Sequence, residues 1–142
     1  MSGDTVRVVS ERFGTYDVPR DRLLQFPEGL VGFADARRFA LLEPNHPDTP
    51  FRYLLCVDRP ELAFLVCDPE PFFAGYTATL PVPADAQPSD VGALVLVTVP
   101  EDAKAMTANL LAPLVLDSRS RTGRQVILDG GQWRTRHRLL PD

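Results

Sequence analysis

The residues that most often carry chemistry in proteins are few in this sequence and lie apart from one another. His46 lies among prolines and His137 among arginines, and neither has a Cys, His or carboxylate neighbour at the spacing of metal ligands. The sequence therefore predicts no metal site. Cys56 and Cys67 lie in two apolar runs of a chain without an export signal, so we expect two buried free thiols. A disulfide between them is the alternative.

No arrangement typical of an enzyme is present. None of the five serines lies in a G-x-S-x-G elbow, and GLVGF and GGQW lack the lysine and the following helix of a phosphate-binding loop. Paired-carboxylate catalysis requires two acidic groups about 5 to 9 Å apart in a cleft. Four acidic residues on predicted turns could converge at one end of a sheet: Asp58, Glu61, Asp68 and Glu70. Because acidic side chains at such positions usually form turns and bind water, we predict no enzyme activity and no cofactor.

Charge is divided unevenly along the chain. Residues 1–117 hold nine Lys and Arg against seventeen Asp and Glu, whereas residues 118–142 hold six Arg against two Asp. The acidic body would repel RNA and attract basic partners. The basic tail carries Trp133 among its arginines, which is a composition that RNA-binding proteins use. RNA binding through the tail and a solvated terminal segment are the two hypotheses, and the acidic body favours no direct binding to nucleic acid.

Neither export nor membrane insertion is indicated. No run of about 18 apolar residues occurs, and the N-terminal segment MSGDTVRVVSERFG has neither the basic region nor the apolar core of a signal peptide. We expect a cytoplasmic protein that does not bind membranes.

Fourteen prolines in 142 residues determine which elements can position these side chains. Proline costs about 3 kcal/mol inside a helix, so long helices are excluded over most of the chain. The stretches between the prolines are short and rich in Val, Leu, Phe and Tyr, which is typical of serial β-strands. Eight or more short strands predict a single all-β domain over residues 1–142. We expect a small antiparallel β-barrel-like fold or a sandwich, with at most short helical turns.

Individual segments indicate where the strands lie. Residues 51–57 and 62–67 form the clearest hairpin, and both 51–57 and 92–99 are apolar on both faces, so each is expected to contact protein on two sides. The remaining predictions in the second half of the chain are strands at 76–80 (YTATL), about 108–117 and 124–128 (RQVIL), and a turn at 101–107.

A series of segments, in order and at suitable spacing, resembles one known family. The segments are FPEGLVGF (26–33), RRFALL (37–42), VDRPELAFLVCDP (57–69), FFAGY (72–76), LVLVTV (94–99), TANLLAPL (107–114), RTGRQVIL (121–128) and RHRL (136–139). They cover nearly the whole chain, and TANLLAP followed by R-x-G-x-Q is the most specific part. On these segments the sequence resembles the bacterial flagellar assembly factor FliW family.

The resemblance implies a small antiparallel β-barrel-like fold, no catalytic activity and two protein partners. It implies binding to newly made cytoplasmic flagellin and antagonism of CsrA, the RNA-binding repressor of flagellin translation. When flagellin is exported, the factor is released and sequesters CsrA, so that translation resumes. The implied function is therefore an exchange of partners.

Residue types indicate which surface each partner would use. CsrA needs a basic surface to hold RNA, so acidic side chains should attract it, and the candidates are Glu61, Asp68, Glu70, Glu101 and Asp102. The terminal segments of flagellin fold only within the filament, so a chaperone for them should present apolar surface or a free strand edge. The candidates for that surface are Phe72, Phe73 and Tyr76, although the sequence favours packing in the core for these aromatics.

Two amides lie in the best-matching motifs and inside predicted strands. They are Asn109 and Gln125. Because a buried amide must be hydrogen-bonded, we expect both to have a structural role, tying adjacent strands or a bulge at Pro113.

Overall fold

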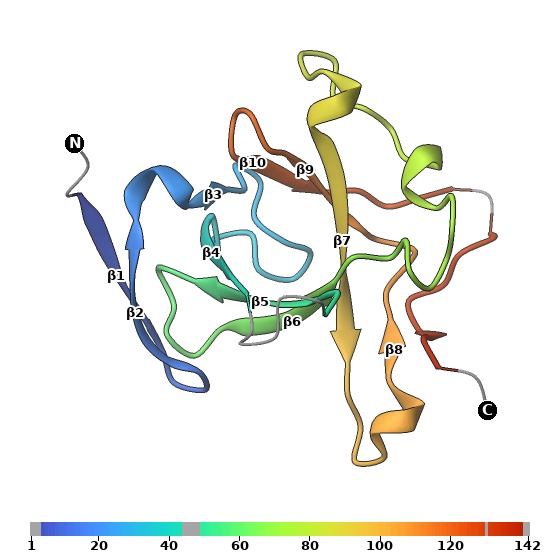
Figure 1. The fold of residues 1–142 in the computed structure, drawn as a ribbon, viewed down its shortest axis with the longest axis horizontal. Coiled ribbons are helices and arrows are strands. Elements are labelled where there is room, and N and C mark those ends of the chain that lie inside the picture. Colours follow the sequence, from blue (N-terminus) through green and yellow to red (C-terminus); the bar gives the residue numbers. More distant parts are fainter. Residues whose placement is uncertain (1–3, 44–48, 130, 141–142) are drawn as a thin grey trace.

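The computed structural model describes residues 4–43, 49–129 and 131–140, which form strands joined by turns and single-turn 3-10 helices (Figure 1). The strands are β1 (Thr5–Ser10), β2 (Gly14–Pro19), β3 (Leu24–Gln25), β4 (Arg38–Leu42), β5 (Phe51–Cys56), β6 (Ala63–Cys67), β7 (Val91–Thr98), β8 (Thr107–Ala108), β9 (Leu114–Asp117), β10 (Thr122–Gln125) and β11 (His137–Arg138). The 3-10 helices are η1 (Arg20–Arg22), η2 (Thr77–Thr79), η3 (Pro88–Asp90) and η4 (Ala103–Ala105).

Seven strands close into a ring. From β7 the order runs through β6, β5, β4, β3 and β10 to β9, which pairs back with β7. Neighbouring strands in the ring are antiparallel, except that β3 and β10 are parallel and joined through one residue pair, Gln25 with Thr122. Strands β8 and β11 extend the sheet outside the ring, and β1 with β2 forms a separate hairpin. The predicted all-β, barrel-like fold is confirmed.

Alternation along the strands divides the apolar side chains among three cores. Leu54 and Leu94 belong to the core inside the ring. Their strand neighbours face outward, where Leu55 packs with Val8 beneath the β1–β2 hairpin and Val95 packs in a third core with aromatic residues from later in the chain. Strands β5 and β7 therefore contact protein on both faces, as predicted for 51–57 and 92–99.

The predicted hairpin at 51–57 and 62–67 is present as β5 and β6, paired from Phe51 with Cys67 to Leu55 with Ala63. The strand predicted at 76–80 is wrong, because this segment forms the η2 turn. Tyr76 and Leu80 are both buried, and their spacing of four residues fits a helical turn as well as a strand. The hydrogen bond from the Leu80 N–H to the Thr77 carbonyl closes a turn at this point.

The predicted strand over 108–117 is interrupted in the structure. Strand β8 ends at Ala108 and β9 begins at Leu114, because Pro113 has no N–H to donate and the intervening residues bond to other partners. The strand predicted at 124–128 ends early, at Gln125, after which the Val126 N–H donates to the Pro113 carbonyl. The turn predicted at 101–107 is confirmed and contains η4.

The turn over residues 26–33 requires glycine at one position for two separate reasons. Gly29 has φ +69°, in the left-handed region, and a β-carbon there would lie 2.5 Å from the Phe33 carbonyl oxygen. Gly32, with φ +85°, has no heavy atom within 4 Å of the same position. Gly29 therefore has to be glycine both because of its left-handed backbone and because neighbouring backbone leaves no space for a β-carbon, whereas only the first reason applies to Gly32.

Replacing Gly29 with alanine is expected to destabilise the protein more than replacing Gly32. Both variants would place a side chain in the left-handed region, at about 1–2 kcal/mol, but only Gly29→Ala also forces backbone atoms apart. Urea unfolding followed by circular dichroism measures the two losses in the free energy of unfolding. Equal losses would contradict the crowding argument.

Candidate partner-binding site

In the described part of the chain, the residue types that could act in catalysis or bind a metal do not lie together in one place. Cys56 and Cys67 are buried and free, as predicted, and burial raises the pKa of the Cys67 thiol to about 12. No group of three or more His, Cys, Asp or Glu side chains there is placed to hold a metal ion. His46 lies outside the described residues. Among those residues, no helix has the length and apolar character needed to cross a membrane.

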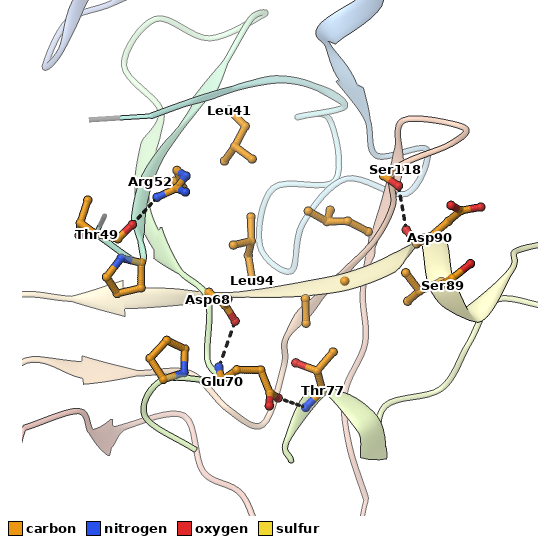
Figure 2. Close-up of a pocket in the computed structure, with 16 residues that line it drawn as sticks. Leu41, Thr49, Arg52, Asp68, Glu70, Thr77, Ser89, Asp90, Leu94 and Ser118 are labelled. Carbon is orange, nitrogen blue, oxygen red and sulfur yellow. Dashed lines mark hydrogen bonds between the residues drawn. The ribbon is translucent and has the colours of Figure 1, made fainter. Parts of the chain in front are cut away.

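One end of the ring opens into a pocket of about 810 Å³, here called the barrel mouth. Its floor is apolar and consists of Leu94 from the inner core with Leu41 and Leu116, which pack against that core. In Figure 2, Leu41 and Leu94 point toward each other across the pocket. Its rim is polar, and the charged side chains on it are Arg52, Asp68, Glu70 and Asp90.

Hydrogen bonds hold the charged rim in place. The Arg52 guanidinium donates through Nη1 to the carbonyls of Thr49 (2.6 Å) and Phe51 (2.9 Å). The two carboxylate oxygens of Glu70 accept from the N–H groups of Thr77 (2.7 Å) and Gly75 (3.0 Å), and these bonds lower the pKa of Glu70. Glu70 therefore stays ionised and fixes the loop that follows β6 (Figure 2).

The acidic candidates are divided among separate places. Asp68 and Glu70 lie at the barrel mouth together with Asp90, which no sequence pattern had indicated. Glu61 lies before β6 and pairs with Arg59 at 3.0 Å, while Asp68 follows the same strand. Since five strand residues at roughly 3.3 Å each separate the two ends, Glu61 lies apart from Asp68 and Glu70, and the convergence of the four acidic residues that the sequence left open does not occur.

The remaining two acidic candidates lie in the connection between β7 and β8. Glu101 and Asp102 are exposed, and the Asp102 carboxylate accepts from the Lys104 N–H at 3.1 Å, which caps η4. Both carboxylates are open to a partner, in a connection separate from the β6 turns.

The aromatic candidates join the segment after β6 to the C-terminal segment. Phe73 and Tyr76 contact Trp133, with ring centroids 6.2 and 5.0 Å apart, and Phe72 contacts Phe51 at 6.1 Å. Tyr76 is 2% exposed, so the expectation of exposed apolar surface is wrong for this residue, which belongs to the core. Phe72 and Phe73 are half-buried and offer only part of their surface.

The two amide candidates bond to backbone close to Pro113. Gln125 accepts through Oε1 from the Val31 N–H (2.7 Å) and donates through Nε2 to the Ala112 carbonyl (3.1 Å). The Asn109 carbonyl oxygen accepts from the Ala112 N–H (3.0 Å). Both side chains are half-buried, and they supply bonds where the strand ladder is interrupted.

The described part of the basic tail contacts the rest of the chain at several points, while Arg119, Arg124, Arg134, Arg136 and Arg138 are exposed. The Arg121 guanidinium donates to the Arg22 carbonyl, and Arg124 pairs with Glu28 at 3.3 Å. Trp133 is half-buried in the aromatic cluster. The indole that would have stacked on an RNA base is therefore used in packing.

The fold defines the class of protein, which is a small β-barrel protein. Its seven-stranded ring is closed, and the mouth at one end is open and carries charged side chains on its rim. Residues 7–139 match the family model described as FliW protein. The chain belongs to the FliW family, as the resemblance of its motifs predicted.

Relatives support this assignment over nearly the whole length. The chain is similar to the flagellar assembly factor FliW of Natranaerobius thermophilus, with 37% identity over 144 residues that cover 96% of this chain and 94% of the relative. The FliW of Heliobacterium modesticaldum is 36% identical over 141 residues, covering 96% and 92%. A crystal structure of the flagellar assembly factor FliW superposes with a TM-score of 0.84 and 29% identity, covering 96% of this chain and 98% of that chain.

Replacing Tyr76 with phenylalanine is expected to destabilise the protein by about 1–3 kcal/mol, because the buried Leu110 carbonyl would lose its 2.6 Å partner. Tyr16→Phe is the matched control, since the Tyr16 hydroxyl donates to the exposed Phe13 carbonyl at 2.7 Å and water can replace it. Thermal and urea unfolding compare the two variants. A Tyr76→Phe variant as stable as Tyr16→Phe would contradict the role given to this bond.

Stability is also expected to fall at mildly acidic pH through His137. Its Nε2 accepts from the Arg134 N–H (2.7 Å), and burial, followed by the charge of Arg134, lowers the pKa of this imidazole. As the pH falls, His137 takes up a proton in the unfolded state before it does so in the folded state. The free energy of unfolding therefore keeps the contribution of His137 above about pH 6.5 and loses it as the pH falls below that value. Urea unfolding at several pH values should show a steeper decline for the unmodified chain than for His137→Gln, and parallel curves would refute this.

Proposed function

We propose that the protein is a cytoplasmic flagellar assembly factor that binds flagellin and, once released, binds and antagonises the translational regulator CsrA. Relief of CsrA repression would then restore translation of flagellin mRNA when flagellin has been exported. The observation that carries this proposal is the family match over residues 7–139, together with relatives named flagellar assembly factors over nearly the full chain.

The distribution of charge supports the CsrA part of the proposal. A protein that holds RNA needs a basic surface, and residues 1–117 of this chain have an excess of acidic side chains. Asp68, Glu101 and Asp102 are exposed and form none of the ion pairs found among the described residues. Bound to CsrA, these carboxylates would attract its basic surface and repel RNA phosphates.

The flagellin part rests on the family match, with Phe72 and Phe73 as the remaining aromatic candidates. Direct RNA binding through the tail is the alternative function. It is less well supported, because Trp133 packs against Tyr76 and the charge of Arg124 is paired with Glu28.

Reversing charge at the exposed acidic candidates is expected to weaken CsrA binding. Asp68→Lys and the double variant Glu101→Lys/Asp102→Lys should each raise the dissociation constant several-fold at low salt, with a smaller effect at high salt because added ions screen the attraction. Isothermal titration calorimetry with purified CsrA measures this. The double variant Asp21→Lys/Asp85→Lys changes two exposed acids outside the candidate set and should bind as the unmodified chain does.

Competition separates the proposed function from its alternatives. Flagellin added to a complex of this protein with CsrA should release CsrA, and the protein should not bind single-stranded RNA. Failure of the unmodified chain to bind either protein partner would overturn the proposal, and RNA binding lost on removal of residues 130–142 would establish the alternative.

A further inference from the structure

One of the two edges of strand β7 is paired with another strand along only half of its length. On the side of β9, residues Val91 to Leu94 are paired with Asp117 to Leu114. On the side of β6, pairing is limited to Val95–Val97, which face Cys67–Leu65. After Asp68 the ladder to β7 is not continued, because Pro69 has no N–H to donate and its carbonyl accepts from the N–H groups of Phe72 (3.0 Å) and Phe73 (2.8 Å). Within the described residues, the first half of β7 therefore has an open edge.

Backbone hydrogen bonds identify the groups that face this open edge. The carbonyl of Asp90 accepts from the Ser118 N–H, and that of Leu96 accepts from the Asn109 N–H, so both point toward the β9 side. Since backbone groups alternate between the two edges of a strand, the N–H and carbonyl of Ala93 point toward the side that β6 has left. No hydrogen bond within the described residues occupies them. Ala93 thus offers one donor and one acceptor for an added strand.

The barrel mouth provides space beside the open edge. Gly92 and Ala93 both line it, and a β-carbon on Gly92 would meet no heavy atom within 4 Å. Neither a left-handed backbone nor crowding explains this glycine, and glycine inside a strand weakens it and marks places where another chain approaches closely. The space over Gly92 is floored by Leu94 and Leu116.

The charge around this space favours a cationic side chain. Asp68, Glu70 and Asp90 lie on the rim against a single guanidinium, that of Arg52, whose Nη1 donates to two backbone carbonyls. A lysine or arginine could lay its aliphatic stem on the leucine floor and place its charge near these carboxylates. An acidic side chain at the same position would be repelled.

We propose that the barrel mouth and the open edge of β7 bind an extended, basic segment of a protein partner. The segment adds a strand that continues where β6 ends, exchanging hydrogen bonds with Ala93. Its residue opposite Gly92 points into the mouth and is a lysine or arginine. The inference deepens the proposed function, on which it rests for the existence of a basic partner protein, by naming the surface and the chemistry of the segment.

The test uses the full chain and a nine-residue peptide of alternating leucine and lysine, acetylated and amidated at its ends. Its counterpart with glutamate in place of lysine controls for sequence-independent binding. Gly92→Leu fills the space over Gly92 and leaves every charge in place. Ala93→Pro removes the N–H that faces the open edge, a position where proline is tolerated in strands. Thr15→Leu adds the same leucine at an exposed position of β2 and is the matched control.

Calorimetry should show that the unmodified chain and Thr15→Leu bind the lysine peptide equally, and that Gly92→Leu and Ala93→Pro bind it at least ten-fold more weakly. The glutamate peptide should not bind. Circular dichroism and thermal unfolding establish that each variant is folded, and if one is not, the other decides the test. No binding of the lysine peptide, equal binding by the folded variants, or equal binding of the glutamate peptide would each overturn the proposal.

The same variants titrated with purified flagellin and CsrA distinguish this inference from the proposed function. If the unmodified chain binds the lysine peptide at the mouth but neither protein, the proposed function fails and the surface assignment stands. If it binds a protein partner and both folded variants bind that partner equally well, the surface assignment fails and the proposed function stands.

Discussion

Closure of the ring between β3 and β10 is the constraint on which the rest of the structure depends. These strands meet in parallel through one residue pair, supported by the Gln25 N–H donating to the Arg121 carbonyl. A β-carbon on Gly123 would lie 2.4 Å from the ring of Phe26, so the inner core can extend beneath β10 only because this residue is glycine. Gln125 then bonds across to the turn that contains Val31. The most specific motifs of the sequence thus meet at the seam of the barrel.

The outer faces of the ring are partly covered by other segments of the chain. Since the strands of the ring carry apolar residues on both faces, the outside must be covered, by the β1–β2 hairpin on one side and by the aromatic cluster with the C-terminal segment on another. The exposed connections, the partly covered aromatics and the open end of the ring are left uncovered. Acidic residues lie in these connections and at the open end.

The features of the fold that depend on residues close together in the chain could be predicted from the sequence. The β5–β6 hairpin and the strands that are apolar on both faces follow from local apolar patterns, and the buried thiols follow from the apolar runs around both cysteines. The burial of Tyr76 could not be decided from the sequence, because a turn that returns to the core cannot be distinguished locally from an exposed one. The division of the acidic residues between the two ends of β6 was deducible, since Glu61 and Asp68 flank one predicted strand. The barrel mouth was not, because Leu41, Arg52, Gly92 and Leu116 are brought together only by ring closure.

The pairing of Gln25 with Thr122 has a kinetic meaning as well. It joins a segment near the start of the chain to one near its end, and contacts so distant in sequence form slowly, after the entropy of closing a long loop has been overcome. During synthesis the first six strands would leave the ribosome before the last strands of the ring, β9 and β10, have been made, so their inner faces would be uncovered. The barrel is therefore completed only after β10 has been made, and until then the nascent chain has exposed apolar strands that can aggregate.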